Sequence, residues 1–434
     1  MQEWQKNDYI SRDEMTSIQL EKLNLYLKHI YRNSKFYKDF FHDSGLNPDS
    51  FTSLEDLKKL PFTTKADLRD AYPYSMAAVR MKKIMRIHAS SGTTGKPVVM
   101  GYTSGDVSQW SRMMARLCAI AGVSANDIAQ ISFGYGLFTG GFGLHYGLEK
   151  LGATVVPFSS GNTERQLALM KDFKTTVLVS TPSFAIYMAE SAMEKNIDPA
   201  SFSLRVGLFG GEPCSELMRQ EIEKHFKIKA TVNYGLTEVV GPGVSGECEH
   251  CSGMHIMEDY IIPEIIDPET KEQLADGETG ELVLTPVFKR GFPVIRYRTG
   301  DITRLIPGRC SCGRVLKRMD YITGRTDDML IIKGVNIFPS QIEEVLATFR
   351  EVSPHYRLVV HSEKGFNQDI EVHVELTQEG FSDSFKEMES LENRIRQALR
   401  SSLSLGPRIK LMNPKSIERS TGKSKRIFSA EGDE

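Results

Sequence analysis

Short apolar runs alternate with helix-like segments through the middle of the chain, and this alternation restricts the possible folds more than any other feature. The runs lie at residues 176–179, 206–209 and 230–232, and the helix-like segments include residues 165–172 and 215–225. Short continuous apolar runs are typical of strands buried on both faces, which helices connect in parallel. From about residue 84 onward, the pattern therefore predicts a large α/β domain built on a parallel sheet.

The last hundred residues carry a different pattern, which predicts a second, smaller domain. Ser340, followed three residues later by a glutamate, has the spacing of a capping box at a helix start. Residues 370–376 alternate apolar and polar side chains like a half-exposed strand, and apolar residues recur at helical spacing over 388–399. Because 434 residues are too many for one core, we expect a large domain at 1–326 and a small α+β domain at 327–434.

A segment dense in hydroxyl groups and glycine lies at residues 90–97. It reads Ser90, Ser91, Gly92, Thr93, Thr94, Gly95, Lys96 and Pro97. Glycines let the backbone approach a ligand, the hydroxyls add donors, and the lysine adds positive charge, so the segment is suited to a polyphosphate. It is not a Walker A motif, because only two residues separate its glycines and proline follows its lysine. A surface turn is the alternative interpretation.

Two further glycine-containing segments directly follow predicted strands. The sequence GGEP at 210–213 follows the run at 206–209, and NYGLTE at 233–238 follows the run at 230–232. Ligands of parallel α/β sheets bind at the carboxyl ends of the strands. We therefore expect both segments to lie at a ligand site.

Charge and composition exclude several classes of protein. The chain has 54 Lys and Arg against 56 Asp and Glu, so it lacks the basic excess typical of nucleic-acid binding. We find no apolar run long enough for a membrane span. Six cysteines are too few for a disulfide scaffold in a chain of this length. A cytoplasmic protein without nucleic-acid or membrane partners is expected.

Four of the cysteines form two close pairs. Cys248 and Cys251 are separated by two residues, and Cys310 and Cys312, separated by one, lie 62 residues beyond Cys248. Two pairs of thiols beside glycines indicate a structural zinc site. Free thiols in a reducing compartment are the alternative.

Seven motifs occur in order along most of the chain. They are SSGTTGKP, FGYGLFTGGFG at 133–143, GGEP, NYGLTE, YRTGD at 297–301, GRTDDMLIIKGVNIFPSQIE at 324–343 and STGKSKR at 420–426. With them the chain resembles the adenylate-forming enzymes of the acyl-CoA synthetase superfamily, and among these the phenylacetate-CoA ligases. The resemblance implies a large α/β N-terminal domain of the adenylate-forming type and a small mobile C-terminal domain.

The same resemblance implies a two-step reaction with ATP, Mg²⁺ and CoA. An aryl acid reacts with ATP to give an acyl-adenylate and pyrophosphate, and CoA then displaces AMP. Thr237 is expected to contact the α-phosphate, Glu238 to bind Mg²⁺, and Asp301 and Arg325 to bind the ribose. The other nucleotide-binding residues implied are Ser90, Ser91, Gly92, Thr93, Thr94, Gly95 and Lys96 for the phosphates, and Gly211, Glu212, Pro213, Asn233, Tyr234 and Gly235 around the adenine.

Lys423 is the catalytic lysine that the resemblance implies. In the family, a lysine of the C-terminal domain reaches the forming adenylate and leaves when that domain rotates. Lys425 is a competing candidate, because both residues lie in a basic segment near the chain end. Asp327 is the expected hinge residue, with Asp328 as the alternative.

The remaining expectations concern the acid, the metal and the assembly. Tyr135, Phe138 and Phe142 are expected to line the aryl pocket, with core packing as the alternative. Relatives also indicate His255 as a zinc ligand with Cys248, Cys310 and Cys312, in competition with Cys251, and they indicate a homodimer. The alternative functions are a nucleotidyltransferase of the same fold and a non-catalytic zinc-stabilised interaction module.

Overall fold

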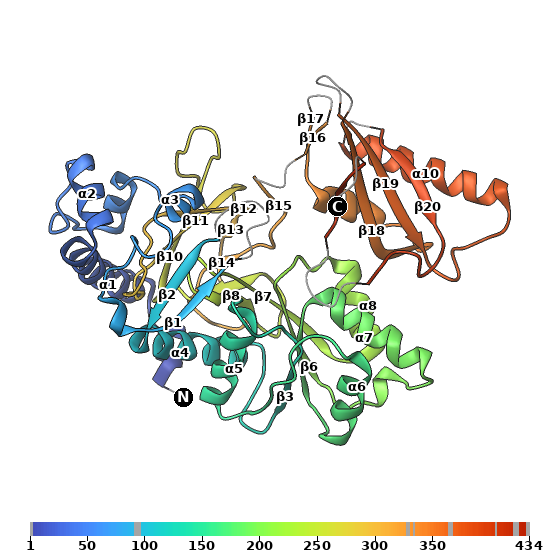
Figure 1. Cartoon of the computed structure of the whole chain (residues 1–434), viewed down its shortest axis with the longest axis horizontal. Helices are drawn as coiled ribbons and strands as arrows, with labels where there is room; N and C mark the ends of the chain where they lie inside the picture. The colour runs from blue at the N-terminus through green and yellow to red at the C-terminus, as the bar shows by residue number, and fades with distance from the viewer. Residues whose placement is uncertain are drawn as a thin grey trace.

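The structure is a computed structural model, and it describes residues 3–90, 97–326, 330–332, 335–362, 368–403, 406–419 and 425–430. Figure 1 shows a large N-terminal body and a smaller C-terminal one, coloured orange to red, beside helices α7 and α8. The large body has a mixed sheet with a parallel part connected by crossover helices, and the small one has helices packed on a four-stranded sheet. The predicted fold class is confirmed.

A nine-stranded sheet in the order β13-β14-β9-β8-β7-β6-β5-β3-β4 forms the centre of the large body. Its strands from β7 to β4 are parallel, as the apolar runs predicted, and those from β8 to β13 are antiparallel. The bounds are β3 Ile128–Ile131, β4 Thr154–Val156, β5 Val177–Ser180, β6 Val206–Phe209, β7 Lys229–Leu236, β8 Gly241–Glu247, β9 Met254–Ile256, β13 Leu305–Ile306 and β14 Arg318–Met319.

Helices connect or cover these strands, and most of them begin with a side-chain cap. Thr103 and Asp106 form a capping box at the start of α4, and the Ser215 hydroxyl accepts from the Met218 N–H at the start of α8. The helices of this layer are α4 Ser104–Ile120, α5 Gly140–Leu151, α6 Thr163–Asp172, α7 Pro182–Glu194 and α8 Glu216–Phe226, with a 3₁₀ turn, η4, at Pro199–Ser201.

Two smaller antiparallel sheets and an N-terminal helical layer complete the large body. One sheet pairs β1 Ile84–Ala89 with β2 Val99–Thr103, and the other has the order β10-β11-β12-β15. The latter strands are β10 Ile261–Ile266, β11 Gly280–Pro286, β12 Tyr297–Thr303 and β15 Gly324–Arg325. The N-terminal elements are η1 Glu3–Asp8, α1 Arg12–Asn33, α2 Lys35–Ser44, η2 Leu54–Lys59, α3 Lys65–Asp70 and η3 Met81–Lys83.

The C-terminal body has its own apolar core, formed by buried residues between Ile332 and Ile409. Its main sheet has the order β20-β19-β18-β21, and a hairpin of β16 and β17 precedes it. The elements are β16 Leu330–Ile332, β17 Val335–Ile337, α9 Pro339–Leu346, β18 Val352–Ser362, β19 Gln368–Leu376, α10 Phe385–Leu403, β20 Arg408–Met412 and β21 Ile427–Ser429. The boundary expected between 326 and 327 adjoins residues outside the described ranges and stays a prediction.

The predicted start of α9 was wrong. Phe338, not Ser340, is the N-cap, and the Gln341 side chain accepts a hydrogen bond from the Phe338 N–H, 2.9 Å away. Pro339 occupies the first helical position, where its fixed φ is favourable and its missing N–H costs nothing. Ser340 therefore lies inside the first turn, and its hydroxyl donates to the Thr323 carbonyl.

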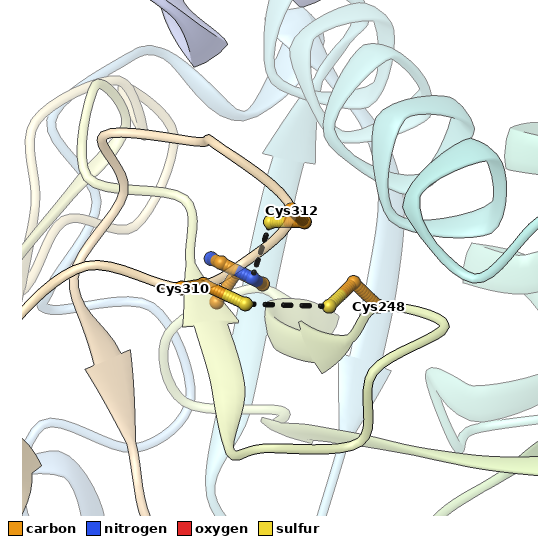
Figure 2. A group of neighbouring side chains, drawn as sticks. Cys248, Cys310 and Cys312 are labelled. Carbon is orange, nitrogen blue, oxygen red and sulfur yellow. Dashed lines mark hydrogen bonds between the residues drawn. The ribbon is translucent and has the colours of Figure 1, made fainter.

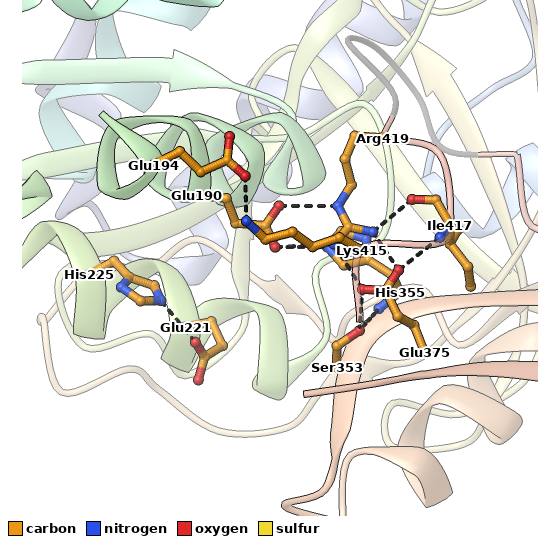
Figure 3. A network of polar contacts seen from close by, with 10 residues as sticks. All are labelled: Glu190, Glu194, Glu221, His225, Ser353, His355, Glu375, Lys415, Ile417 and Arg419. Carbon is orange, nitrogen blue, oxygen red and sulfur yellow. Dashed lines mark hydrogen bonds and ion pairs between the residues drawn. The ribbon is translucent and has the colours of Figure 1, made fainter. Parts of the chain in front are cut away.

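An ion cluster joins the two bodies at α7 (Figure 3). Glu190 on α7 pairs with Arg419 at 3.1 Å and lies 3.6 Å from His355, both of the C-terminal body. One turn further along the helix, Glu194 pairs with Lys415. Through the described ranges, no helix combines the length and the apolar character that crossing a membrane requires.

Candidate active site

The two glycine-containing segments meet at the carboxyl ends of β6 and β7, as expected. Asn233 Nδ2 donates to the Phe209 carbonyl at 2.8 Å, which ties the two strand ends together. A Cβ atom on Gly210 would lie 2.6 Å from the Asn233 carbonyl oxygen, and Gly211 has a φ of +83°. Glycine at 210 therefore allows a close approach that a side chain would block, and glycine at 211 adopts a backbone conformation that other residues rarely take.

Two other predicted nucleotide-site residues shape this region through the backbone. The Glu212 carboxylate accepts a hydrogen bond from the Ser183 N–H, 2.8 Å away, in the first turn of α7. A Cβ on Gly235 would lie 1.9 Å from the Gly241 carbonyl oxygen, so no side chain fits at this position. Pro213, next to Glu212, is exposed at the surface.

Asp301, Arg325 and Tyr234 form one polar cluster. Asp301 on β12 lies opposite Arg325 on β15, and their side chains form an ion pair. The Tyr234 hydroxyl donates to the other oxygen of the same carboxylate. Burial raises the pKa of Tyr234, so the phenol remains protonated and can act as a donor. Residues that the sequence separates by up to 91 positions thus meet at one carboxylate.

Thr237 and Glu238 follow β7 directly and are both more than nine-tenths buried. The hydroxyls of Thr237 and Thr139 are 3.4 Å apart. The Tyr102 hydroxyl donates to the Thr237 carbonyl at 3.2 Å, and the Lys289 ammonium donates to the Glu238 carbonyl at 3.1 Å. None of these three supporting residues was identified from the sequence.

An aromatic cluster adjoins Thr237 through Tyr102. The Tyr102 ring stacks on Trp110 with centroids 5.4 Å apart and meets His88 edge-on at the same distance. His88 contacts Phe142, whose ring contacts Tyr135 at 5.2 Å. Two of the three predicted pocket residues therefore lie in one cluster.

The third predicted pocket residue, Phe138, is 48% exposed. His145, left without a role from the sequence, lies 3.1 Å from the Tyr135 hydroxyl through Nδ1. Trp110 and His88 were not predicted; the signals available were a rare tryptophan and a histidine two residues before Ser90.

His88 presents a buried acceptor inside this cluster. Its Nδ1 lies 3.0 Å from the Leu137 carbonyl, which can only accept, so Nδ1 carries the proton. Burial lowers the pKa of His88 to about 4, so the ring is neutral near pH 7. Its Nε2 and the Ser90 hydroxyl are both buried and have no hydrogen-bond partner among the described residues. Such groups are costly to leave unpaired and fit a site that a ligand completes.

Several predicted residues lie outside the described ranges. They are Ser91, Gly92, Thr93, Thr94, Gly95 and Lys96 of the phosphate segment, the hinge candidates Asp327 and Asp328, and the catalytic candidate Lys423. Lys425 is described, and its ammonium lies 5.1 Å from the Phe428 ring centroid.

Cys248, His255, Cys310 and Cys312 form a compact group in which the potential ligand atoms all lie within 4.8 Å of one another. Figure 2 shows Cys248 facing Cys310, with a sulfur to sulfur distance of 3.7 Å. Cys312 Sγ lies 3.4 Å from His255 Nε2. Cys251, the competing candidate, lies outside this group, and its sulfur faces the carbonyls of Ala230 and Cys248.

The thiols of this group differ in protonation, and burial raises the pKa of Cys248 to about 12. Burial opposes ionisation of Cys310, but hydrogen bonds from Cys312, Ser252 and Cys248 lower its pKa to about 6. Burial lowers the pKa of His255 to about 4, so its imidazole is neutral. Three sulfurs and one neutral imidazole are a ligand set that zinc prefers.

Comparison with known proteins matches this architecture to one family. Residues 44–286 match the family described as AMP-binding enzyme, and residues 334–430 match the AMP-binding enzyme C-terminal domain. Phenylacetate-coenzyme A ligase from Escherichia coli is 46% identical over 96% of this chain and 95% of its own length. The enzyme of that name from Thermus thermophilus is 42% identical over 95% of this chain and 96% of its own length.

Solved structures of a CoA ligase have the same fold as this chain. A 2-hydroxyisobutyryl-CoA ligase in the postadenylation state, bound to 2-HIB-AMP, has a TM-score of 0.92 at 26% identity and covers 98% of this chain and 92% of its own. The same ligase with CoA in its thioesterification state gives a TM-score of only 0.72, at 26% identity and with 98% and 91% covered. The arrangement of the two bodies is therefore more similar to that of the postadenylation structure than to that of the thioesterification structure. By these relatives and by the matched domains, the chain belongs to the AMP-binding enzymes and, among them, to the phenylacetate-coenzyme A ligase family.

Proposed function

We propose that this protein uses ATP and CoA to convert phenylacetate, or a close arylacetic acid, into the arylacetyl-CoA thioester, AMP and pyrophosphate. The observation that carries the proposal is the continuity between the aromatic cluster and the predicted phosphate-contacting residue. Tyr102 packs against His88 and Trp110 and hydrogen-bonds to Thr237 through its hydroxyl. An aryl acid seated among these rings would present its carboxylate close to Thr237.

In the first step, a carboxylate oxygen attacks the α-phosphorus of ATP and pyrophosphate leaves. Thr237 would donate its hydroxyl to the α-phosphate, and Glu238 would hold Mg²⁺, which neutralises phosphate charge when bound. The Asp301 carboxylate, kept in place by Arg325 and Tyr234, would accept hydrogen bonds from the ribose hydroxyls. In the second step, the CoA thiol attacks the acyl carbon and AMP leaves.

The segments at 210–213 and 233–235 would line the adenine, and the phosphate segment with Lys96 would hold the outer phosphates. The buried Ser90 hydroxyl at the start of that segment, which no other described residue satisfies, supports a ligand there. Lys423 is proposed as the adenylation lysine, with Asp327 as the hinge, on the basis of the family resemblance. A homodimer also remains a prediction.

A structural zinc ion bound by Cys248, His255, Cys310 and Cys312 is a further part of the proposal. It would join the β8–β9 connection, which carries Cys248, and strand β9, which carries His255, to the loop between β13 and β14, which carries Cys310 and Cys312. A site with four protein ligands leaves no open position, so its role would be stability rather than chemistry.

A panel of acids tests the function. CoA-dependent AMP formation should have a higher kcat/KM with phenylacetate than with hexanoate, because a rigid ring buries area among Tyr135, Phe142 and Trp110 with little entropy to lose. Equal or better turnover of hexanoate would disprove the aryl assignment. Pyrophosphate release that does not need CoA would instead favour the nucleotidyltransferase alternative.

A further inference from the structure

Lys289, in the loop between β11 and β12, is fully buried. Its ammonium donates to the Glu238 carbonyl at 3.1 Å and lies 4.7 Å from the centroid of the Tyr102 ring. A buried ammonium is costly unless its surroundings compensate it, and lysine is among the residues least often found fully buried. Its position inside the molecule therefore calls for an explanation beyond packing.

The loop that carries Lys289 is held firmly from the other side. The Asp106 carboxylate accepts hydrogen bonds from the backbone N–H groups of Arg290 at 2.8 Å and Gly291 at 2.9 Å. A Cβ on Gly291 would lie 2.5 Å from the Gly101 carbonyl oxygen, so the loop packs directly against β2. The base of the Lys289 side chain is thus fixed to the start of α4 and to β2.

Lys289 and Tyr102 act on two consecutive peptide groups. Tyr102 donates to the carbonyl of Thr237, and Lys289 donates to the carbonyl of Glu238. The two donors also contact each other through the cation and the ring face. The backbone of the segment proposed to contact the α-phosphate and Mg²⁺ is therefore supported from inside by two buried side chains.

We infer that Lys289 is a positioning residue, which holds the Thr237–Glu238 backbone in the geometry that receives the α-phosphate and its Mg²⁺. The inference rests on the proposed function of those two residues. Lys289 does not touch the substrates; it acts through the Glu238 carbonyl. A catalytic arrangement needs such support because small displacements of the groups that contact the reacting atoms lose much of their effect.

The test compares Lys289→Met, which keeps the length and apolar stem of the side chain, with Arg290→Met as a matched control. Arg290 is the neighbouring residue, and its side chain is exposed. Binding of Mg²⁺-ATP is measured by calorimetry without the acid, and the KM values for Mg²⁺-ATP and phenylacetate are measured separately. Lys289→Met should weaken Mg²⁺-ATP binding on the order of tenfold, as expected for the loss of one buried hydrogen bond. The KM for phenylacetate and the behaviour of Arg290→Met should stay near wild type.

A folded Lys289→Met protein with wild-type affinity and KM for Mg²⁺-ATP would overturn the inference, as would an equal rise in both KM values. If Lys289→Met does not fold, Tyr102→Phe is measured instead, because it removes only the hydroxyl that donates to the Thr237 carbonyl. This variant should also weaken Mg²⁺-ATP binding. A wild-type protein that binds Mg²⁺-ATP but forms no thioester with any aryl acid would refute the proposed function, while the binding comparison would still decide the role of Lys289.

Discussion

Replacing Glu190 by glutamine should selectively weaken the contact between the two bodies. Its carboxylate oxygens lie 3.1 and 3.3 Å from Arg419 nitrogens. Arg419 also binds Glu375 of its own body at 2.8 and 2.9 Å, so Glu190→Gln leaves the C-terminal body intact. The loss is confined to the interface in Figure 3.

The size of the effect follows from burial. The Glu190 and Arg419 side chains are 24% and 12% exposed, so their ion pair is neither fully exposed nor fully buried. An exposed ion pair contributes about 0–1 kcal/mol to stability and a buried charged hydrogen bond about 1.5–3 kcal/mol. We expect a loss of about 1–2 kcal/mol, which changes the population of this arrangement roughly 5- to 30-fold. Because this arrangement resembles the postadenylation structure, adenylation should slow by up to the same factor, and toward its lower end because Gln keeps one acceptor.

The assay measures the two half-reactions separately. Acid-dependent exchange of pyrophosphate into ATP reports adenylation, and thioester formation from presynthesised phenylacetyl-adenylate reports the second step. The second step should not slow in Glu190→Gln, because it needs the other arrangement. Glu194→Gln, on the same helix, is the matched control: its partner Lys415 is 52% exposed, so little change is expected. An equal loss in both steps, or an equal effect of Glu194→Gln, would refute the reasoning.

The pH dependence of this contact has a definite sign. Burial disfavours the charged form of Glu190, but the neighbouring His355 and the hydrogen-bonded Arg419 lower its pKa to about 2, below the ordinary 4.5. A carboxyl with a depressed pKa in the folded protein stabilises it above about pH 4.5 and loses that contribution as the pH falls toward 2. The ratio of the two half-reactions should therefore show no contribution from titration of Glu190 between about pH 6 and 8.

Three further predictions follow from other sites. Purified protein should carry about one equivalent of zinc, and Cys310→Ser should lower stability more than turnover; metal-free reduced protein in elemental analysis would contradict this. Lys423→Ala should lower the rate of adenylation by about 10²–10³-fold and leave the rate of the thioester step unchanged. An equal loss in both rates would contradict this role and favour Lys425 as the catalytic lysine. Gly235→Ala should destabilise the protein by about 1–3 kcal/mol in thermal unfolding, because its Cβ would overlap a backbone oxygen. Gly105→Ala in α4, whose Cβ would meet its nearest atom at 3.6 Å, should not destabilise it.

The fold was predictable because strands buried on both faces leave a continuous apolar signal. Each of the three runs became a strand, β5, β6 or β7, at nearly the expected residues. The start of α9 could not be predicted in the same way. Ser340 and Pro339 both favour helix starts, and the local sequence does not show which of them lies at the first position. In the structure, Pro339 occupies the first helical position, and the Gln341 side chain accepts the capping hydrogen bond from the Phe338 N–H.

The site was predictable only in part. The order of the motifs identified Asp301, Arg325 and Tyr234 as residues of the nucleotide site. Their contact at one carboxylate depends on the register of β12 with β15, which cannot be predicted from the sequence. His255 joins the cysteines because β9 pairs with β14. Lys289 and Tyr102 were missed because a buried polar residue in a loop or strand becomes visible only when tertiary contacts show what it supports.

Helix α7 contacts the proposed adenine site at one end and the C-terminal body at the other. Its first turn binds Glu212 of the turn beside the proposed adenine site, and its last turns carry Glu190 and Glu194 against the C-terminal body. A helix of 13 residues is a rod about 20 Å long that moves as a unit. Because the second step needs the other arrangement, the contacts of Glu190 and Glu194 must break before AMP leaves, while the Glu212 end of the same helix still adjoins the bound nucleotide. We therefore expect α7 to stay anchored at its first turn when its last turns lose the C-terminal body.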